Sequence, residues 1–440
     1  MKKRIFCAVF AAICTLSLIL PVAAEDTTAD EKGVLEPPVL QNVGTAIVYN
    51  IENDRYIYEL DADKIIPPAS TVKLMTAIVA VEALGNDLSR EVTVEAGAIV
   101  GVTGSNIALK RGEVLTVEQL LYALICGGAN DAANVLAFEV AGSIEAFVAL
   151  MNEKAQEIGA VNTVYTNPTG MDDPAMVTTT RDVAIIATYA YKTAPICEMG
   201  SVEKFVIPAN NKAGQRTIFN KNYYFSTHME YKYIWNIPRG LNAGYTPNGG
   251  SCVVTTGHRN GLTYVVAVMG ASSDDDYIYS YTEAADLIKW AYNAYDYTKL
   301  LTTSDMVCEI PVKLSSRVDY VTLFPSENVE LYLPTGLDLE KDINIEWTLD
   351  HDSFTAPVSE GEVGGKLTIT YNGVNLGTYD LVTRNSVNRD NILYVLDLVS
   401  GFTETTAFKV IAVTVGVAVA GYIAVLIFIR TVRTKKQRRF

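Results

Sequence analysis

Cysteine and positive charge are the two things that this 440-residue sequence has little of. Six cysteines occur, and two of them lie in an N-terminal segment that is expected to be removed. The other four lack the paired spacing of a metal site, and nothing in their positions requires a disulfide, although disulfides are permitted outside the cell. These four are Cys126, Cys197, Cys252 and Cys308. Lysine and arginine number 35 against 50 acidic residues, and the formal charge of −15 argues against nucleic-acid binding.

The first 24 residues are typical of a secretory signal peptide. A basic tripeptide at 2–4 precedes an apolar run from Ile5 to Leu20, and small residues at 22–24 fit a cleavage site. An N-terminal membrane anchor is the alternative, but the run is short for a span. The polar stretch at 25–41 is predicted to be a flexible lead-in.

The C-terminal end has the pattern of a transmembrane helix. Residues 410–429 carry no charge and are long enough to cross a bilayer. Six basic residues follow within 430–440, and basic flanks stay in the cytoplasm, so the tail is predicted inside and everything before Val410 outside. A buried core helix is the alternative. Without the basic residues of the two ends, the exported part has a formal charge of −24.

Residues 42–298 show the patterns of an α+β domain. β-rich runs at 45–50 and 55–60 predict a hairpin, and strand patterns return at 251–256 and 262–270. Helical patterns lie between and after them, which indicates a sheet that uses both ends of the domain. The helices are predicted at residues 70–84, at 116–140 with a break near Gly127-Gly128, and at 143–158, 181–192 and 282–295.

Short alternating runs separated by turn residues replace the helical patterns after residue 305. They predict a small all-β domain at 305–390, of the sandwich type. Residues 391–409 are predicted to be a juxtamembrane connector. The six strand patterns fall at 312–314, 318–323, 329–333, 343–347, 367–371 and 378–382.

Ser70 and Lys73 open a long apolar helical pattern. Positions i and i+3 share one face of a helix, so the hydroxyl and the amine can meet. A lysine that is desolvated there loses part of its preference for the charged form and can accept the serine proton. The alternative is a Ser70 that only caps the helix and a Lys73 that is solvated.

Four stretches together resemble the low-molecular-mass penicillin-binding proteins, which are serine-type D-alanyl-D-alanine carboxypeptidases. Pro68–Thr76 is similar to the family's Ser-x-x-Lys motif, Gly128–Ala133 to its second motif, and Gly240–Thr246 to its third. Asn167–Pro174 resembles a family loop. The resemblance covers residues 44–382 and implies a serine β-lactamase/transpeptidase-like α+β domain, followed by a small all-β domain and one transmembrane helix.

The resemblance also implies catalytic roles. Ser70 attacks the carbonyl of the penultimate D-alanine of a peptidoglycan stem pentapeptide, and Lys73 takes its proton. Asn130 holds the lysine and the substrate amide, and the backbone N–H groups of Ser70 and Tyr245 form an oxyanion hole. Neither metal nor cofactor takes part. Peptidoglycan stem peptides are the implied substrates, and β-lactam antibiotics are the implied covalent ligands.

The substrate-binding strand is implied to contain Asn242, Gly244, Tyr245 and Thr246, and two motifs depart from the family here. Gly128 replaces the serine of Ser-x-Asn, and Asn242-Ala243-Gly244 replaces Lys-Thr-Gly. The lost cation is worth about 1.5–3 kcal/mol of charge-assisted hydrogen bonding. A lost general acid costs a factor of roughly 10²–10⁴. The prediction is a carboxypeptidase of impaired or altered activity. A catalytically silent peptidoglycan-binding protein, or a β-lactamase or esterase on the same fold, is the alternative.

Several residues near these motifs carry alternative interpretations. Thr255-Thr256-Gly257 offers a second register for the third motif. Arg239 and Arg259 are candidates for the missing cation, although solvated charges are commoner. His258 is a candidate base and Cys126 a candidate thiol. The tyrosine-rich stretches at 223–225 and 277–281 either line a substrate groove or pack.

Overall fold

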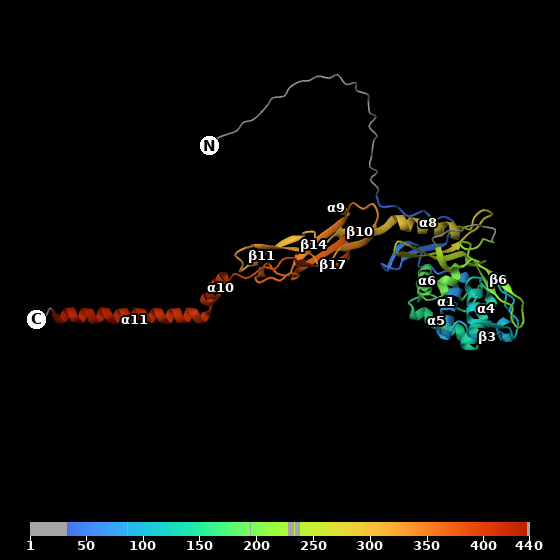
Figure 1. Cartoon of the computed structure of the whole chain (residues 1–440), viewed down its shortest axis with the longest axis horizontal. Helices are drawn as coiled ribbons and strands as arrows, with labels where there is room; N and C mark the ends of the chain where they lie inside the picture. Colours follow the sequence, from blue (N-terminus) through green and yellow to red (C-terminus); the bar gives the residue numbers. More distant parts are fainter. Residues whose placement is uncertain (1–32, 86, 194, 228–232, 234–237, 438–440) are drawn as a thin grey trace, which may run out of the picture.

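The computed structural model describes residues 33–85, 87–193, 195–227, 233 and 238–437. The chain is elongated, with an N-terminal domain at one end, a β domain in the middle and a long C-terminal helix at the other end (Figure 1). The predicted signal peptide and the first part of the lead-in lie outside the described residues.

A five-stranded antiparallel sheet in the order β2-β1-β9-β8-β7 organises the N-terminal domain. The predicted hairpin is confirmed, and it pairs with a late strand through β1, so the sheet uses both ends of the domain. The edge strand β7 contains the predicted third motif, Gly240–Thr246, and lies beside the helical layer. The strands are β1 (Thr45–Asn50), β2 (Arg55–Leu60), β7 (Pro238–Thr246), β8 (Gly250–Arg259) and β9 (Leu262–Ala271).

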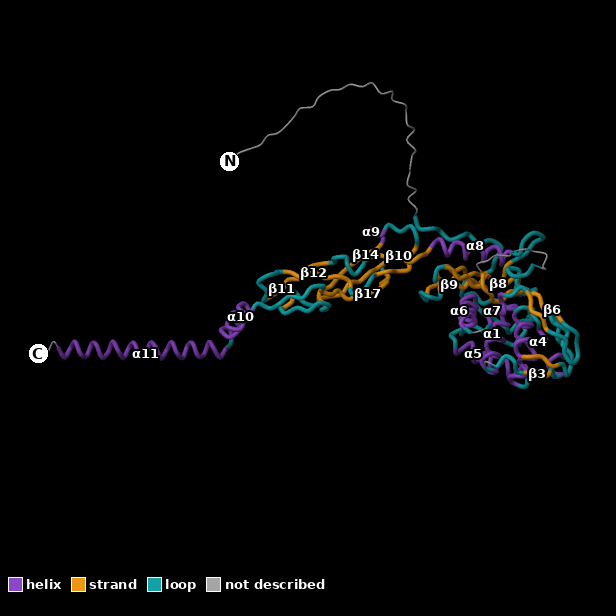
Figure 2. The backbone as a smooth tube through the Cα atoms, viewed as in Figure 1, coloured by secondary structure: helices purple, strands orange, loops and turns teal. Residues whose placement is uncertain are grey.

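Helices cover both faces of this sheet (Figure 2). The larger layer surrounds α1, whose residues from Val72 to Val81 are all buried, and the predicted break at Gly127-Gly128 separates α3 from α4. The opposite face is covered by α8. The helices are α1 (Val72–Leu84), α2 (Ala96–Ile99), α3 (Val117–Ile125), α4 (Asn130–Ala141), α5 (Ile144–Glu157), α6 (Thr180–Lys192), α7 (Ile196–Ser201) and α8 (Tyr279–Ala294).

The described part of the lead-in, residues 33–41, lies against α8. The Trp290 indole donates to the Leu35 carbonyl at 3.0 Å, and the Gln41 backbone N–H donates to the Glu283 carboxylate at 3.4 Å. These two contacts place residues 33–41 on the domain surface, and the predicted flexibility of the lead-in stays a prediction.

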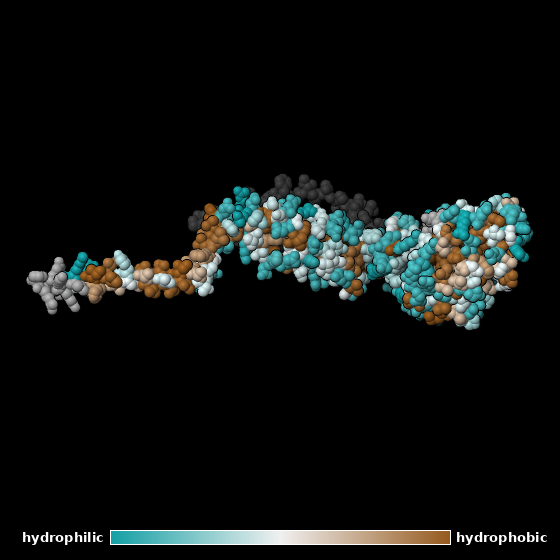
Figure 3. Space-filling model, turned by 90° about the horizontal axis from the view of Figure 1, so that it is seen from below, coloured by the Kyte–Doolittle hydropathy of each residue, from teal (hydrophilic) through white to brown (hydrophobic). Residues whose placement is uncertain are grey.

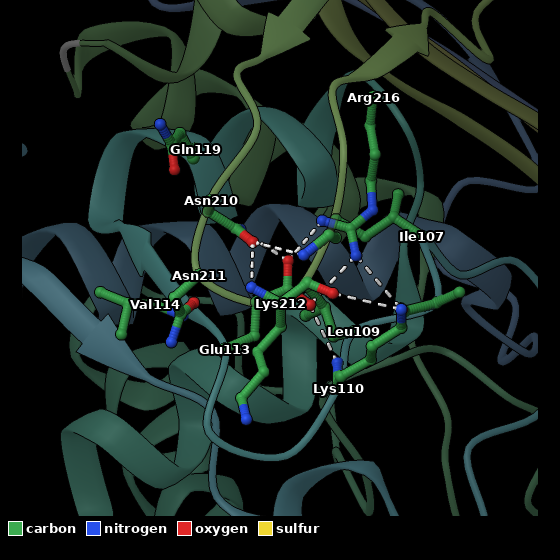
Figure 4. Close-up of polar contacts among 12 residues, drawn as sticks. Ile107, Leu109, Lys110, Glu113, Val114, Gln119, Asn210, Asn211, Lys212 and Arg216 are labelled. Atoms are coloured by element: carbon green, nitrogen blue, oxygen red, sulfur yellow. Dashed lines mark hydrogen bonds and ion pairs between the residues drawn. The ribbon is translucent and has the colours of Figure 1, made fainter.

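Two small hairpins extend the helical layer and have no counterpart among the sequence predictions. They are β3 (Glu91–Thr93) with β4 (Val114–Thr116), and β5 (Lys204–Ile207) with β6 (Arg216–Phe219). Glu113, which is fully buried, joins them (Figure 4). Its carboxylate pairs with the Arg216 guanidinium and accepts from the Asn210 amide at 2.7 Å and the Lys110 backbone N–H at 3.0 Å.

The β domain begins ten residues earlier than the predicted start at 305. Helix α8 passes directly into β10 (Tyr295–Leu301), which pairs with β13 (Val329–Pro334) beside a six-stranded sheet. All six predicted strand positions fall within observed strands or overlap them. The strands of the larger sheet are β11 (Cys308–Lys313), β12 (Tyr320–Pro325), β14 (Ile343–Leu349), β15 (Phe354–Thr355), β16 (Val363–Tyr371) and β17 (Val374–Thr383); a short helix α9 (Leu339–Asp342) precedes β14.

Two helices end the chain. The predicted connector contains α10 (Asn391–Glu404), and α11 (Thr406–Gln437) follows it. Hydrophobic residues make up much of the visible surface of the narrow arm in Figure 3, which is α11. Within the part of the chain that the structure describes, Thr406–Thr431 is the one unbroken helix apolar and long enough to cross a membrane, with a mean hydropathy of 2.6. It contains the predicted span at 410–429.

Candidate active site

Ser70 lies in a single 3-10 turn, Ala69–Thr71, that leads into α1. Ala69 has a left-handed φ of +49°, which a non-glycine residue rarely adopts and which often marks a functional site. The Lys73 amine lies 3.4 Å from the Ser70 hydroxyl oxygen, as the i, i+3 spacing predicted. The turn therefore presents the hydroxyl at the head of the most buried helix of the domain.

Lys73 is only 2% exposed, and its burial lowers the pKa of the amine to about 7. The alternative of a solvated lysine is therefore wrong. Burial removes the water that solvates the charged ammonium and so disfavours that form. A large fraction of the amine is therefore neutral near pH 7. A neutral amine beside a hydroxyl is the arrangement that a proton acceptor requires.

The loop around Thr169 fixes the Lys73 amine, which donates to the Thr169 carbonyl at 2.5 Å. The Asn167 side chain holds this loop by accepting from the backbone N–H groups of Thr169 and Gly170. Gly170 has φ +79°, and a β-carbon there would stand 2.2 Å from the Ala69 carbonyl oxygen. The sequence flagged this loop by resemblance only, and its backbone contact with the lysine could not be read from side-chain types.

Asn130 begins α4, and its amide donates to the Thr103 carbonyl at 2.8 Å. Its Oδ1 atom is buried without a hydrogen-bond partner among the described residues. Lys73 bonds to Ser70 and Thr169 instead, so the implied contact between Asn130 and the lysine is not made in this structure. An unpaired buried acceptor leaves Asn130 available for an incoming N–H group.

Strand β7 lies directly against the nucleophile turn. A β-carbon on Gly244 would stand 2.2 Å from the Ser70 Cβ, so only glycine fits there. Asn242 is 4% exposed, and its Nδ2 has no partner among the described residues. Tyr245 is 66% exposed at the rim, whereas Thr246 is buried and accepts from the Gly249 N–H at 3.0 Å. Thr246 thus shapes a turn, and Gly244 and Tyr245 border the opening.

A cavity of about 470 Å³ opens in front of Ser70. Gly128, Ala243 and Gly244 all line it, so the second and third motifs border one space with the nucleophile. Ser105 and Lys221 also line this cavity, and neither was among the site residues predicted from the sequence. Neither has a local motif of its own; the only available signal was the pair of flanking asparagines around Lys221.

The other candidates lie elsewhere or are inert. Thr255 and Thr256 lie on β8, one strand inside the edge, and their hydroxyls donate to backbone carbonyls of β7. Arg259 lies over the Tyr292 ring, and the His258 imidazole lies 2.9 Å from the Thr263 hydroxyl. Cys126 is buried, which raises the pKa of its thiol to about 12 and excludes a reactive thiolate.

The tyrosine-rich stretches both line the cavity and pack in the core, the two roles that the sequence left open. Tyr223 and Tyr281 line the cavity, while Tyr224 is buried and donates to the Tyr281 carbonyl at 2.6 Å. All four cysteines outside the first 32 residues are free thiols in the structure.

Two family profiles match the chain. The profile of the D-alanyl-D-alanine carboxypeptidases matches residues 34–273, and that of the C-terminal domain of penicillin-binding protein 5 matches residues 295–389. Together they span the N-terminal domain and the β domain. The second match begins at Tyr295, which is also the first residue of β10, the strand that pairs with β13 in the β domain.

Relatives of known name are similar over most of their length. The chain is 25% identical over 399 residues to the D-alanyl-D-alanine carboxypeptidase DacF of Bacillus subtilis, covering 90% of this chain and 98% of that one. It is 26% identical over 383 residues to DacC of Escherichia coli, covering 84% and 90%.

Among solved structures, the carboxypeptidase DacD of Francisella tularensis superposes with a TM-score of 0.60 at 20% identity, covering 81% of this chain and 96% of that one. Penicillin-binding protein 6B of Escherichia coli also reaches 0.60, at 21% identity and with 80% and 98% covered. At such identities these two structures establish the fold alone.

Proposed function

Because the chain belongs to the D-alanyl-D-alanine carboxypeptidase family, we propose that Ser70 is the nucleophile that removes the terminal D-alanine from peptidoglycan stem pentapeptides. The Ser70 oxygen attacks the carbonyl of the penultimate D-alanine while its proton passes to the Lys73 amine. The C–N bond then breaks, the terminal D-alanine leaves with a proton, and water hydrolyses the acyl-enzyme ester.

The observation that carries this proposal is the contact between the two side chains of the first motif. The Lys73 amine lies 3.4 Å from Ser70 Oγ, and burial brings its pKa to about 7. Such an amine is close to half neutral at neutral pH, which suits a general base. Its hydrogen bond to the Thr169 carbonyl keeps it oriented in either protonation state.

The proposal includes a weakened or redirected activity. The cavity wall has Gly128 and Ala243 where the family has hydroxyl groups. Asn242, which is buried beside the wall on β7, stands where the family has a cation. The nucleophile and the base for acyl transfer to Ser70 are both present. The groups that usually protonate the leaving amine and bind the terminal carboxylate are missing. These three positions are also what favours the second candidate, a protein that binds stem peptides without turnover.

The location proposed for this reaction is the outer face of the cell membrane. In this proposal Thr406–Thr431 is the anchor, and the basic residues after it favour a cytoplasmic C-terminal tail. The β domain separates the N-terminal domain from the anchor along the chain's long axis (Figure 1). A cleaved signal peptide at 1–24 accounts for export.

The test uses the full-length chain in detergent. A fluorescent penicillin should label it covalently, and labelling should disappear in Ser70→Ala. Release of D-alanine from a stem pentapeptide is then measured. Labelling with release supports the carboxypeptidase, and labelling without release supports a protein that is acylated but does not turn over the peptide. Absence of labelling at high penicillin concentration and long incubation contradicts the assignment of Ser70.

A further inference from the structure

Lys221 is the only charged side chain among the described residues that line the cavity in front of Ser70. It is exposed at the cavity wall, and no acidic side chain in the described part of the chain forms an ion pair with it. The protein as a whole is strongly acidic. An unpaired cation in a cleft of such a protein marks a place where an anion is favoured.

The backbone around Lys221 is fixed on both sides. The Asn220 amide, which is 1% exposed, donates to the carbonyls of Gly200 and Val202, and Asn222 Oδ1 accepts from the Tyr224 N–H. The N–H of Lys221 itself donates to the Cys126 carbonyl at 2.9 Å. Hydrogen bonds therefore tie the backbone that carries Lys221 to the end of α3 and to the end of α7.

Lys221 and Ser105 both stand where the second motif has lost its hydroxyl. A β-carbon built on Gly128 would have the Lys221 Cγ at 3.7 Å and the Ser105 Oγ at 4.0 Å. Ser105 is itself held in place, because its carbonyl accepts from the Asn130 N–H at 2.7 Å and its hydroxyl donates to the Gly127 carbonyl at 3.3 Å. The Ser105 hydroxyl and the aliphatic stem of Lys221 thus border the space that Gly128 leaves open, and the Lys221 side chain belongs to the cavity wall.

We propose that Lys221 and Ser105 form the subsite that binds the terminal carboxylate of the peptide substrate, in place of the missing lysine and threonine of the third motif. The inference rests on the proposed function and specifies its substrate as a peptide with a free C-terminal carboxylate. The ammonium supplies the charge, and the Ser105 hydroxyl turns from Gly127 to donate a second hydrogen bond.

The other cations suggested by the sequence do not reach this space. Arg259 lies at the far end of β8, over Tyr292, and Arg239 does not belong to the cavity wall. Asn242 is uncharged and almost fully buried. Among the described residues, Lys221 is therefore the cation placed to attract a carboxylate to Ser70.

The experiment compares two peptides that differ only in terminal charge. The full-length Ser70→Ala chain in detergent is titrated calorimetrically with diacetyl-L-lysyl-D-alanyl-D-alanine and with the same peptide as its C-terminal amide. The acid should bind at least tenfold more tightly than the amide. Lys221→Met should remove this preference, Lys221→Arg should retain most of it, and Ser105→Ala should reduce it severalfold. Lys204→Met, an exposed lysine on β5 outside the cavity, should keep it.

Three outcomes overturn the subsite: equal binding of acid and amide by the parent, a preference that survives Lys221→Met, or no binding of either peptide. The proposed function is read separately from penicillin labelling of the chain with Ser70 intact. If the chain is labelled but shows no preference for the acid peptide, the assignment of Ser70 as the nucleophile stands and the subsite is refuted. If the chain shows the Lys221-dependent preference but is not labelled, the subsite stands and the catalytic proposal is refuted.

Discussion

Gly244 lies so close to Ser70 that a β-carbon at position 244 would stand 2.2 Å from the Ser70 Cβ and 2.7 Å from its hydroxyl oxygen. The edge strand β7 and the nucleophile turn therefore touch through a glycine. This contact fixes which residues of β7 face the cavity, and it identifies Asn242-Ala243-Gly244, not Thr255-Thr256-Gly257, as the stretch beside the nucleophile.

Replacing Gly244 with alanine should disable the site. The added methyl group would push β7 and the Ser70 turn apart, and overpacking of this kind costs about 1–3 kcal/mol. We expect Gly244→Ala to lower the thermal unfolding midpoint and to abolish labelling by a fluorescent penicillin. Gly214→Ala is the matched control, since a β-carbon there meets nothing within 4 Å and should leave both unchanged. Normal labelling of Gly244→Ala would refute the close approach.

The acylation rate should rise with pH through the region near 7. Burial lowers the pKa of Lys73 to about 7, and only the neutral amine can take the Ser70 proton. The rate of penicillin labelling, measured between pH 5.5 and 9, should increase about tenfold per pH unit below the pKa and level off above it. A rate that is independent of pH over this range would exclude Lys73 as the base.

The same pKa predicts how Lys73 affects stability. In the unfolded chain the amine titrates near its usual value of 10.5, so between about pH 7 and 10 the unfolded state binds one more proton than the folded state. Unfolding then becomes less favourable as pH rises, by up to about 1.4 kcal/mol per unit relative to Lys73→Met. Below pH 7 the difference in unfolding free energy between the parent chain and Lys73→Met should not change with pH. A difference that stays flat above pH 7 as well would mean that the buried amine keeps its charge.

Local patterns in the sequence were enough to predict most of the fold. Apolar periodicity and β-rich runs located the hairpin at 45–60, the helix after Ser70 and the strands of the β domain, because each reports only on its own segment. The break near Gly128 was also predictable, since that residue has φ +63°, which glycine adopts readily. The start of the β domain was not, because α8 runs into β10 at Tyr295 without a turn residue to mark the boundary.

The site was predictable only in part for a different reason. Ser70 and Lys73 are neighbours on one helix, so their spacing was informative. Ser105 and Lys221 come from segments more than a hundred residues apart, and only tertiary structure brings them to the same cavity wall. Thr169 contacts Lys73 through its backbone carbonyl. Every residue has such a carbonyl, so the residue type at 169 could not predict this contact.

The buried ion pair between Glu113 and Arg216 should matter for stability and for Lys221. Glu113 is fully buried, and although burial opposes ionisation, the hydrogen bonds from Arg216 and Asn210 outweigh it and lower the pKa of the carboxyl. Removing one partner of such a pair costs about 3–5 kcal/mol. Glu113→Ala should therefore lower the unfolding midpoint strongly. It should also weaken the preference for the acid peptide, because β6 leads directly into the segment that carries Lys221.

Two comparisons check this prediction. The double variant Glu113→Leu with Arg216→Met replaces the pair by apolar groups and should recover much of the stability, since no charge is left unpaired. Asp286→Ala removes an exposed partner of Lys289 and should change stability by about 1 kcal/mol or less. Equal losses in Glu113→Ala and Asp286→Ala would show that the buried pair has no special role.

Restoring the family's residues should raise the activity if the site has decayed in the register described above. A β-carbon at 128 has only ordinary contacts, so Gly128→Ser fits, at a backbone cost of about 1–2 kcal/mol for its left-handed φ. Together with Asn242→Lys and Ala243→Thr it should increase D-alanine release by roughly 10²–10⁴-fold through the regained proton relay. Gly142→Ser is the matched control, because it has φ +74° and nothing within 4 Å, and it should give no gain.

The restored variant also tests whether Lys221 substitutes for the missing lysine. With a lysine at 242, two cations would serve one carboxylate, so Lys221→Met should weaken binding of the acid peptide less in the restored chain than in the parent. These two effects are compared as a double-mutant cycle on peptide affinity, which isolates the coupling between the two positions. Additive effects would mean that residues 221 and 242 act on different parts of the substrate. No gain in D-alanine release from the triple substitution would show that the lost hydroxyls and charge are not what limits the reaction at Ser70.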